Sequence, residues 1–179
     1  ALLKVMEEPP EGVLFLLTAD SLAGVLPTIR SRCVSFAVAP VSPEECAQWC
    51  IGQGVDKKQA RLYSELFDGH IGTVLAAARD DARREQVEKA LTLAKAAAAH
   101  DSYAAAVLLA GYEKDKAAAV ALLGDFRAVA AAGLRGCAST PLTADAARRA
   151  LSLADAAIQR LAAQVNPKIT LSVLAAKLG

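Results

Sequence analysis

Two arginines flank a serine in the segment LPTIRSRC, residues 26 to 33. Arg30 and Arg32 lie on either side of Ser31, directly before the apolar run CVSFAVAP, which is typical of a β-strand. An arginine side chain is always charged, and its planar fork of N–H donors matches the geometry of a phosphate. The two residues are therefore candidate anion-binding groups, although ordinary surface arginines would give the same spacing.

Other catalytic patterns are missing from the sequence. It contains neither a GxxxxGK[ST] phosphate-binding loop nor a GxGxxG pattern, so these residues alone are not expected to bind a nucleotide. His70 and His100 lie in a predicted turn and at a predicted helix end, where we expect solvated side chains. Glu7 and Glu8 are adjacent on a helix and so point to different faces, which predicts a solvated helix end and argues against a pair of catalytic carboxylates.

The cysteines also carry little chemistry. Cys46 and Cys50 are four residues apart on a predicted helix and could share a metal, but no second pair completes a site. We expect them to be small buried residues. The four cysteines form neither a CxxC pair nor a dense disulfide framework, which is typical of reduced thiols in a cytoplasmic protein: Cys33, Cys46, Cys50 and Cys137.

Composition favours a helical protein with a real core. The chain has 179 residues, 54% of them hydrophobic, and alanine-rich stretches such as AKAAAAH favour helix over sheet. Lys and Arg number 20 against 19 acidic residues, so a net charge of +1 supplies no general attraction to nucleic acid or to anionic membranes. Every apolar run is broken by charge, Gly or Pro well short of the roughly 18 to 20 residues that span a bilayer, so no membrane span is expected.

The first 40 residues read as the closing part of an α/β domain. ALLKVMEE predicts a helix that ends at Pro9 and Pro10, and it begins in mid-helix, which suggests a fragment. Residues 13–18 (VLFLLT) are apolar on both faces and predict a central strand, residues 22–31 a short helical turn, and residues 33–38 a second strand. Two strands without the rest of their sheet leave unpaired edges, so this part should be poorly supported.

Helices dominate after Pro40. Ser42, Pro43 and Glu45 form a capping box that starts one helix, and Asn166 with Pro167 starts the last. Asp56 and Thr143 are further predicted caps. The predicted helices span about 43–51, 56–68, 71–78, 81–100, 102–111, 114–136, 144–165 and 167–178.

The N-terminal motifs resemble a known family. Leu2 to Pro10 match the LLKxxEEPP helix end, and Ser31, Arg32 and Cys33 match the Ser-Arg-Cys motif, of clamp-loader subunits of bacterial DNA polymerase III, which belong to the AAA+ superfamily. The C-terminal segment NPKITLSVLAAKL is similar to the end of the delta-prime type. The resemblance implies a fold that is mainly α: the end of an AAA+ α/β domain (1–40), a helical lid (41–98) and a C-terminal helical collar (99–179).

The resemblance also implies a function. Arg32 would be an arginine finger that acts in trans on ATP bound by a neighbouring subunit, with no cofactor in this chain, and Arg30 would serve the interface or solvent. The implied partners are the gamma/tau and delta subunits, with the sliding clamp and primed DNA reached through the complex.

Thr73 stands where the family's lid carries a nucleotide-sensing arginine, and His70 stands where a small hydroxyl residue is usual. The first departure favours a non-hydrolysing delta-prime type. A truncated gamma/tau-type ATPase and a helical interaction module unrelated to replication remain alternatives.

Overall fold

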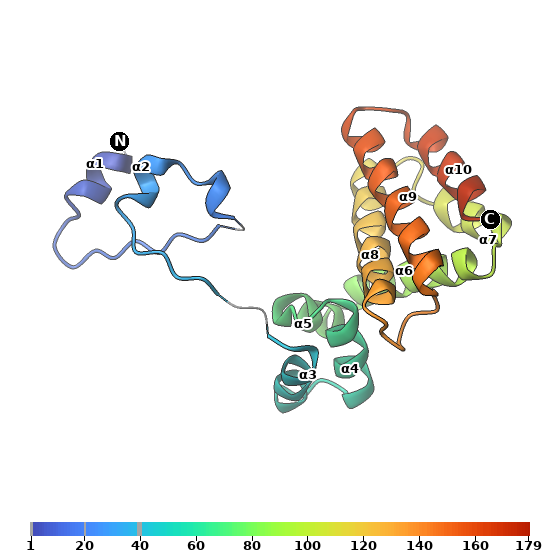
Figure 1. Ribbon diagram of the computed structural model, residues 1–179, viewed down its shortest axis with the longest axis horizontal. Helices are drawn as coiled ribbons and strands as arrows, with labels where there is room; N and C mark the ends of the chain where they lie inside the picture. The colour runs from blue at the N-terminus through green and yellow to red at the C-terminus, as the bar shows by residue number, and fades with distance from the viewer. Residues whose placement is uncertain (1, 20, 39–40) are drawn as a thin grey trace. The chain divides into compact units, whose positions relative to one another are not determined.

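The computed structural model describes residues 2–19, 21–38 and 41–179. The chain divides into two compact units, Ala1–Ala39 and Pro40–Gly179 (Figure 1). Helices account for all the regular structure of the described residues, so the prediction of a mainly helical fold is confirmed.

Among its described residues, the first unit contains three short helical segments and two extended stretches. The segments are α1 (Leu2–Glu7), the 3-10 helix η1 (Leu22–Gly24) and α2 (Pro27–Arg30). The strands predicted at residues 13–18 and 33–38 are not formed, because a strand exists only through its ladder to a neighbour and no described residue supplies one. Both stretches therefore leave their apolar side chains exposed, with Leu16 at 85% and Val38 at 94%.

The second unit is made of eight helices among its described residues. They are α3 (Pro43–Gly52), α4 (Lys57–Leu66), α5 (Ile71–Arg79), α6 (Asp81–Ala98), α7 (Ser102–Ala110), α8 (Lys116–Leu134), α9 (Ala144–Ala162) and α10 (Pro167–Leu178). Helix α8 packs against α4, α6 and α9, while α10 packs against α7 and α9, and α3, α4 and α5 pack against one another. Each of these helices was predicted to within about three residues at its ends.

Side-chain caps explain why the predicted starts were accurate. Ser42 accepts a hydrogen bond from the Glu45 N–H at 3.2 Å, and the Glu45 carboxylate accepts from the Ser42 N–H at 3.2 Å, which completes the predicted capping box. The side chains of Asp56, Thr143 and Asn166 accept hydrogen bonds from backbone N–H groups in the first turns of α4, α9 and α10, without the reciprocal bond of a capping box. Each cap satisfies backbone donors that the first turn of a helix leaves unpaired.

Replacing Ser42 with alanine is expected to destabilise the second unit by about 1 kcal/mol, because it removes this cap. Hydrogen bonds from the Ser42 hydroxyl and backbone lower the pKa of Glu45. The stabilisation from Glu45 is therefore present above the ordinary carboxyl pKa and is lost as the pH falls through the lowered value. Urea unfolding at neutral pH measures the loss, with Ser152→Ala on the exposed face of α9 as a matched control that should change the unfolding free energy by less than about 0.5 kcal/mol.

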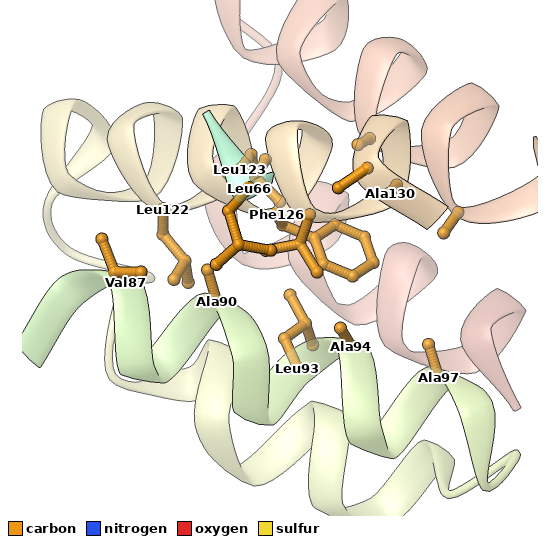
Figure 2. Close-up of a cluster of buried hydrophobic side chains, with 14 of the residues drawn as sticks. Leu66, Val87, Ala90, Leu93, Ala94, Ala97, Leu122, Leu123, Phe126 and Ala130 are labelled. Atoms are coloured by element: carbon orange, nitrogen blue, oxygen red, sulfur yellow. The ribbon is translucent and has the colours of Figure 1, made fainter. Parts of the chain in front are cut away.

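The core lies where α6 and α8 face each other. Figure 2 shows Val87, Leu93 and the alanines of α6 against Leu122, Leu123 and Phe126 of α8, with Leu66 of α4 beside them. Phe126 is fully buried. The small side chains Ala90, Ala94 and Ala97 let the two helices approach closely, which the alanine-rich composition favours.

Two glycines mark close approaches of the backbone. A Cβ added at Gly133 would lie 2.9 Å from the Ala147 Cβ, so α8 and α9 meet there with no room for a larger residue. Gly69 has a φ of +74°, and a Cβ there would lie 1.8 Å from the Val41 carbonyl oxygen. Only glycine fits this turn between α4 and α5.

Helix α8 is long and apolar enough to cross a membrane by length and composition. Its apolar residues are interrupted by Gly124, Asp125 and Arg127, and the absence of a membrane span stays a prediction. Half of its most apolar stretch of 18 residues is buried in the second unit, and its buried Asp125 forms an ion pair with Arg83. Those features are typical of the core helix of a helical bundle.

Candidate functional site

Arg32 lies in the turn directly after α2. Pro27 starts this single helical turn, and the Arg32 N–H donates to the Ile29 carbonyl at 3.0 Å. The chain therefore folds back, and the Arg32 guanidinium reaches the carbonyl of Thr28, where Nη1 donates at 2.8 Å. Nη1 also donates to the Ser31 hydroxyl at 3.2 Å.

A carboxylate from a distant segment holds the other edge of the same guanidinium. Glu7, the last residue of α1, accepts a hydrogen bond from Arg32 Nε at 2.8 Å, and its Oε1 also accepts from Nη2. The side chains of Arg32 and Glu7 are 33% and 46% exposed, so the ion pair lies at the surface of the first unit. Pairs of this kind typically contribute only about 0–1 kcal/mol to stability.

This pairing was not predicted. The sequence reading assigned Glu7 to a solvated helix end, and no local pattern links a glutamate to an arginine 25 residues later. This contact joins the two motifs that carry the family resemblance, the EEPP helix end and Ser-Arg-Cys.

Of the other residues of the arginine motif, only Ser31 joins the hydrogen-bonded cluster of Arg32, Glu7 and Thr28 among the described residues. Ser31 belongs to it, since its hydroxyl accepts from Arg32 and donates to the Thr28 carbonyl at 3.2 Å. Arg30 is exposed at the end of α2, and Cys33 is a half-buried free thiol. Within the described residues, no side-chain hydrogen bond connects either of them to Arg32.

The lid positions compared with the family pattern lie in and before α5. Thr73 is half-buried on that helix. His70 precedes α5 and is exposed, and its Nδ1 donates to the Phe67 carbonyl at 2.6 Å. His100 is also exposed, with its Nδ1 at 2.9 Å from the Gly179 carbonyl, so both histidines have the solvated positions that were predicted.

The cysteine pair of α3 is structural. Cys46 and Cys50 are both fully buried, as expected. Burial, reinforced by the neighbouring Cys46 thiol, raises the pKa of Cys50 to about 11, which keeps this thiol protonated and unreactive at neutral pH. Among the described residues no cluster of His, Cys, Asp or Glu is placed to hold a metal ion.

A buried polar cluster ties α6 to α8. Asp125 of α8 is 6% exposed and accepts from Arg83 Nη2 at 2.6 Å, from Arg83 Nη1, and from Gln86 Nε2 at 2.8 Å. The Arg83 guanidinium also lies 5.6 Å from the centroid of the Phe67 ring, a cation–π distance. The hydrogen bond to Asp125 raises the pKa of Arg83 further above its ordinary value. The sequence reading missed this cluster, which fixes the packing of three elements.

Comparison with known proteins shows that the N-terminal segment is similar to subunits of DNA polymerase III. Residues 1–42 match the family model described as "DNA polymerase III, delta subunit". The individual proteins that are similar to this chain are delta' and gamma subunits of DNA polymerase III. The delta' subunit of Yersinia pestis is 47% identical over 49 residues, which cover 27% of this chain and 14% of that protein.

Two further relatives come from Buchnera aphidicola. A gamma subunit (subspecies Schizaphis graminum) is 30% identical over 81 residues, covering 42% of this chain and 22% of the relative. A delta' subunit (subspecies Baizongia pistaciae) is 30% identical over 74 residues, covering 41% and 22%. No solved structure gives a significant match. The resemblance to DNA polymerase III subunits is thus confirmed, while the chain spans less than a quarter of the length of these relatives.

Proposed function

We propose that this chain works as a delta-prime-like subunit of the DNA polymerase III clamp loader, in the cytoplasm. It would assemble with gamma/tau and delta subunits, and the complex would load the sliding clamp on primed DNA. The observation that carries the proposal is the exposed Arg32 guanidinium, held at a turn by a contact between the two motifs that resemble this family.

Arg32 would act on ATP bound by the neighbouring subunit, and this part of the chain would hold no cofactor of its own. The guanidinium would donate hydrogen bonds to the γ-phosphate, where negative charge develops as the phosphoryl group is transferred. An arginine already oriented by its own subunit loses little conformational freedom when the neighbour arrives. Ser31 would hold the turn, and the exposed Arg30 would serve the interface or solvent.

The exposed apolar stretches fit the same proposal. Residues 13–18 and 33–38 would be strands of an AAA+ α/β domain (1–40) that pair with further strands in the assembled protein. Apolar surface of this extent marks an interaction site rather than a solvated face. Residues 41–98 would form the lid and 99–179 the collar, although α6 packs against helices of both parts.

The collar would meet its counterparts through α7 and α10. A groove of about 460 Å³ lies between these helices, lined by residues that include Tyr103, Leu109, Leu171 and Ala175. Tyr103 is 79% exposed, and Val107 of α7 and Ile169 of α10 are also exposed. An unpartnered apolar face of this kind suits a helix of a neighbouring subunit.

A gamma/tau-type ATPase is the second candidate, because one relative is a gamma subunit. Thr73 in place of a nucleotide-sensing arginine argues against it. Measuring ATP binding by the whole protein that carries this chain separates the two, since a delta-prime type should bind none and a gamma/tau type should bind through a phosphate loop.

Assembly tests the proposal directly. We expect the protein to co-elute with gamma/tau and delta subunits on size exclusion, and Tyr103→Asp to weaken that association at least about tenfold because it buries a charge. Ser152→Asp, on the exposed face of α9, is the control that should leave association unchanged. Failure to associate with any clamp-loader subunit would contradict the proposal and support the unrelated helical interaction module instead.

A further inference from the structure

We propose that Glu7 is a positioning residue for Arg32: its carboxylate fixes the plane of the guanidinium so that the remaining donors face a neighbour's phosphate. This inference rests on the proposed function of Arg32 and adds a second residue to the site. Glu7 contacts Arg32 within the same subunit and would not contact ATP itself.

The donors of Arg32 divide into two edges. A guanidinium has five N–H groups in one plane. Glu7 Oε1 accepts from Nε and from the Nη2 hydrogen that points the same way, so the carboxylate occupies the side edge of the fork. Nη1 donates to Thr28 and Ser31. No residue in the described part of the chain accepts the second Nη2 hydrogen, which lies on the end edge of the guanidinium, away from Glu7.

This arrangement leaves the end edge as the one that can meet an anion. A phosphate could take the remaining Nη2 hydrogen and displace the 3.2 Å bond from Nη1 to the Ser31 hydroxyl, without disturbing the two bonds to Glu7. The Glu7 carboxylate on the side edge therefore restrains the orientation of the guanidinium. Without Glu7, the guanidinium would be held only through Nη1 and could rotate about its terminal bonds.

The position of Glu7 supports a role beyond stability. It is the last residue of α1, where a negative charge meets the negative end of the helix dipole and is unfavourable unless it has a partner. The pair is also about as exposed as an ordinary surface salt bridge, and such pairs add little to folding. The contact between Glu7 and Arg32 therefore acts mainly by orienting the Arg32 guanidinium.

Glu8 provides a matched control. It is the next residue along the chain and carries the same charge, and its backbone N–H continues α1 by donating to the Lys4 carbonyl at 3.1 Å. Its side chain is exposed. A general change in charge near Arg32 would affect both glutamates, whereas positioning requires Glu7 alone.

The test is a double-mutant cycle in the reconstituted complex with gamma/tau and delta subunits, read out as single-turnover ATP hydrolysis on primed DNA. We expect Glu7→Ala to lower the rate at the neighbouring site at least about tenfold with an unchanged ATP concentration dependence, because a misplacement of about 1 Å can cost a hundredfold. Glu7→Gln keeps the acceptor oxygen and should recover most of the rate, and Glu8→Ala should match the wild type. Glu7→Ala combined with Arg32→Ala should be no slower than Arg32→Ala alone.

Each other result overturns the inference. If Arg32→Ala slows hydrolysis but Glu7→Ala does not, or if the two losses multiply, Glu7 does not position the finger and the function proposed for Arg32 survives. If Arg32→Ala has no effect, the proposed function itself fails and the inference falls with it. Loss of co-elution with the partner subunits in Glu7→Ala, restored in Glu7→Gln, would assign Glu7 to assembly instead.

Discussion

Replacing Arg32 with alanine is expected to lower the rate of ATP hydrolysis at the neighbouring site by about 10³ or more. A loss of that size corresponds to roughly 4 kcal/mol of transition-state stabilisation. The effect would be this large because, in the proposed role, the guanidinium would meet charge that develops mainly in the transition state, in a site that the two subunits would close off from water. Single-turnover hydrolysis in the assembled complex on primed DNA measures it.

Two controls separate a finger from a general effect of charge. Arg32→Lys keeps the positive charge but loses the planar fork, and it should still cost about tenfold or more, because a lysine cannot bond Glu7 on one edge and a phosphate on the other. Arg30→Ala removes a charge two residues away, from an exposed side chain, and should leave hydrolysis nearly unchanged. Normal hydrolysis by an Arg32→Ala complex that has assembled correctly would exclude the finger role.

The helices could be predicted from the sequence because their signals are local. Ser42 and Asn166 predict the starts of α3 and α10, and each side chain forms the predicted cap. The strands predicted at residues 13–18 and 33–38 did not form, because a strand needs a neighbouring strand and the described residues provide none. A locally correct pattern therefore gave extended chain without a sheet.

The candidate site was only half visible in the sequence. Arg32 was found from its motif, but Glu7 was not, because the contact joins residues that are distant along the chain and the helix gives Glu7 no distinguishing position. The same limit applies to the buried Asp125, which reads as a charge interrupting an apolar helix. Long-range polar pairs depend on tertiary packing, and periodicity does not encode them.

Asp125→Ala is expected to destabilise the second unit by about 3 kcal/mol, near the lower end of the cost of breaking a buried ion pair. The carboxylate is 6% exposed and accepts from both Nη atoms of Arg83 and from Gln86. Removing it leaves the half-buried Arg83 guanidinium and the Gln86 amide without their acceptor. The Arg83 side chain is 23% exposed, which gives it partial access to water and places the cost near the lower end. Urea unfolding at neutral pH measures the change through the midpoint at constant m-value.

The matched control for Asp125 is the exposed pair between Arg127 of α8 and Asp155 of α9, joined at 3.1 Å with side chains that are 53% and 46% exposed. Asp155→Ala breaks an ion pair at the same helix but in solvent, so it should cost less than about 1 kcal/mol. Replacing Asp125 and Arg83 together by Leu and Met should recover most of the loss, because the penalty arises from the charge left unpaired rather than from the absence of the pair. Equal losses of unfolding free energy for Asp125→Ala and Asp155→Ala would show that Asp125 is solvated in the folded protein. The polar cluster would then not be what holds α6 against α8.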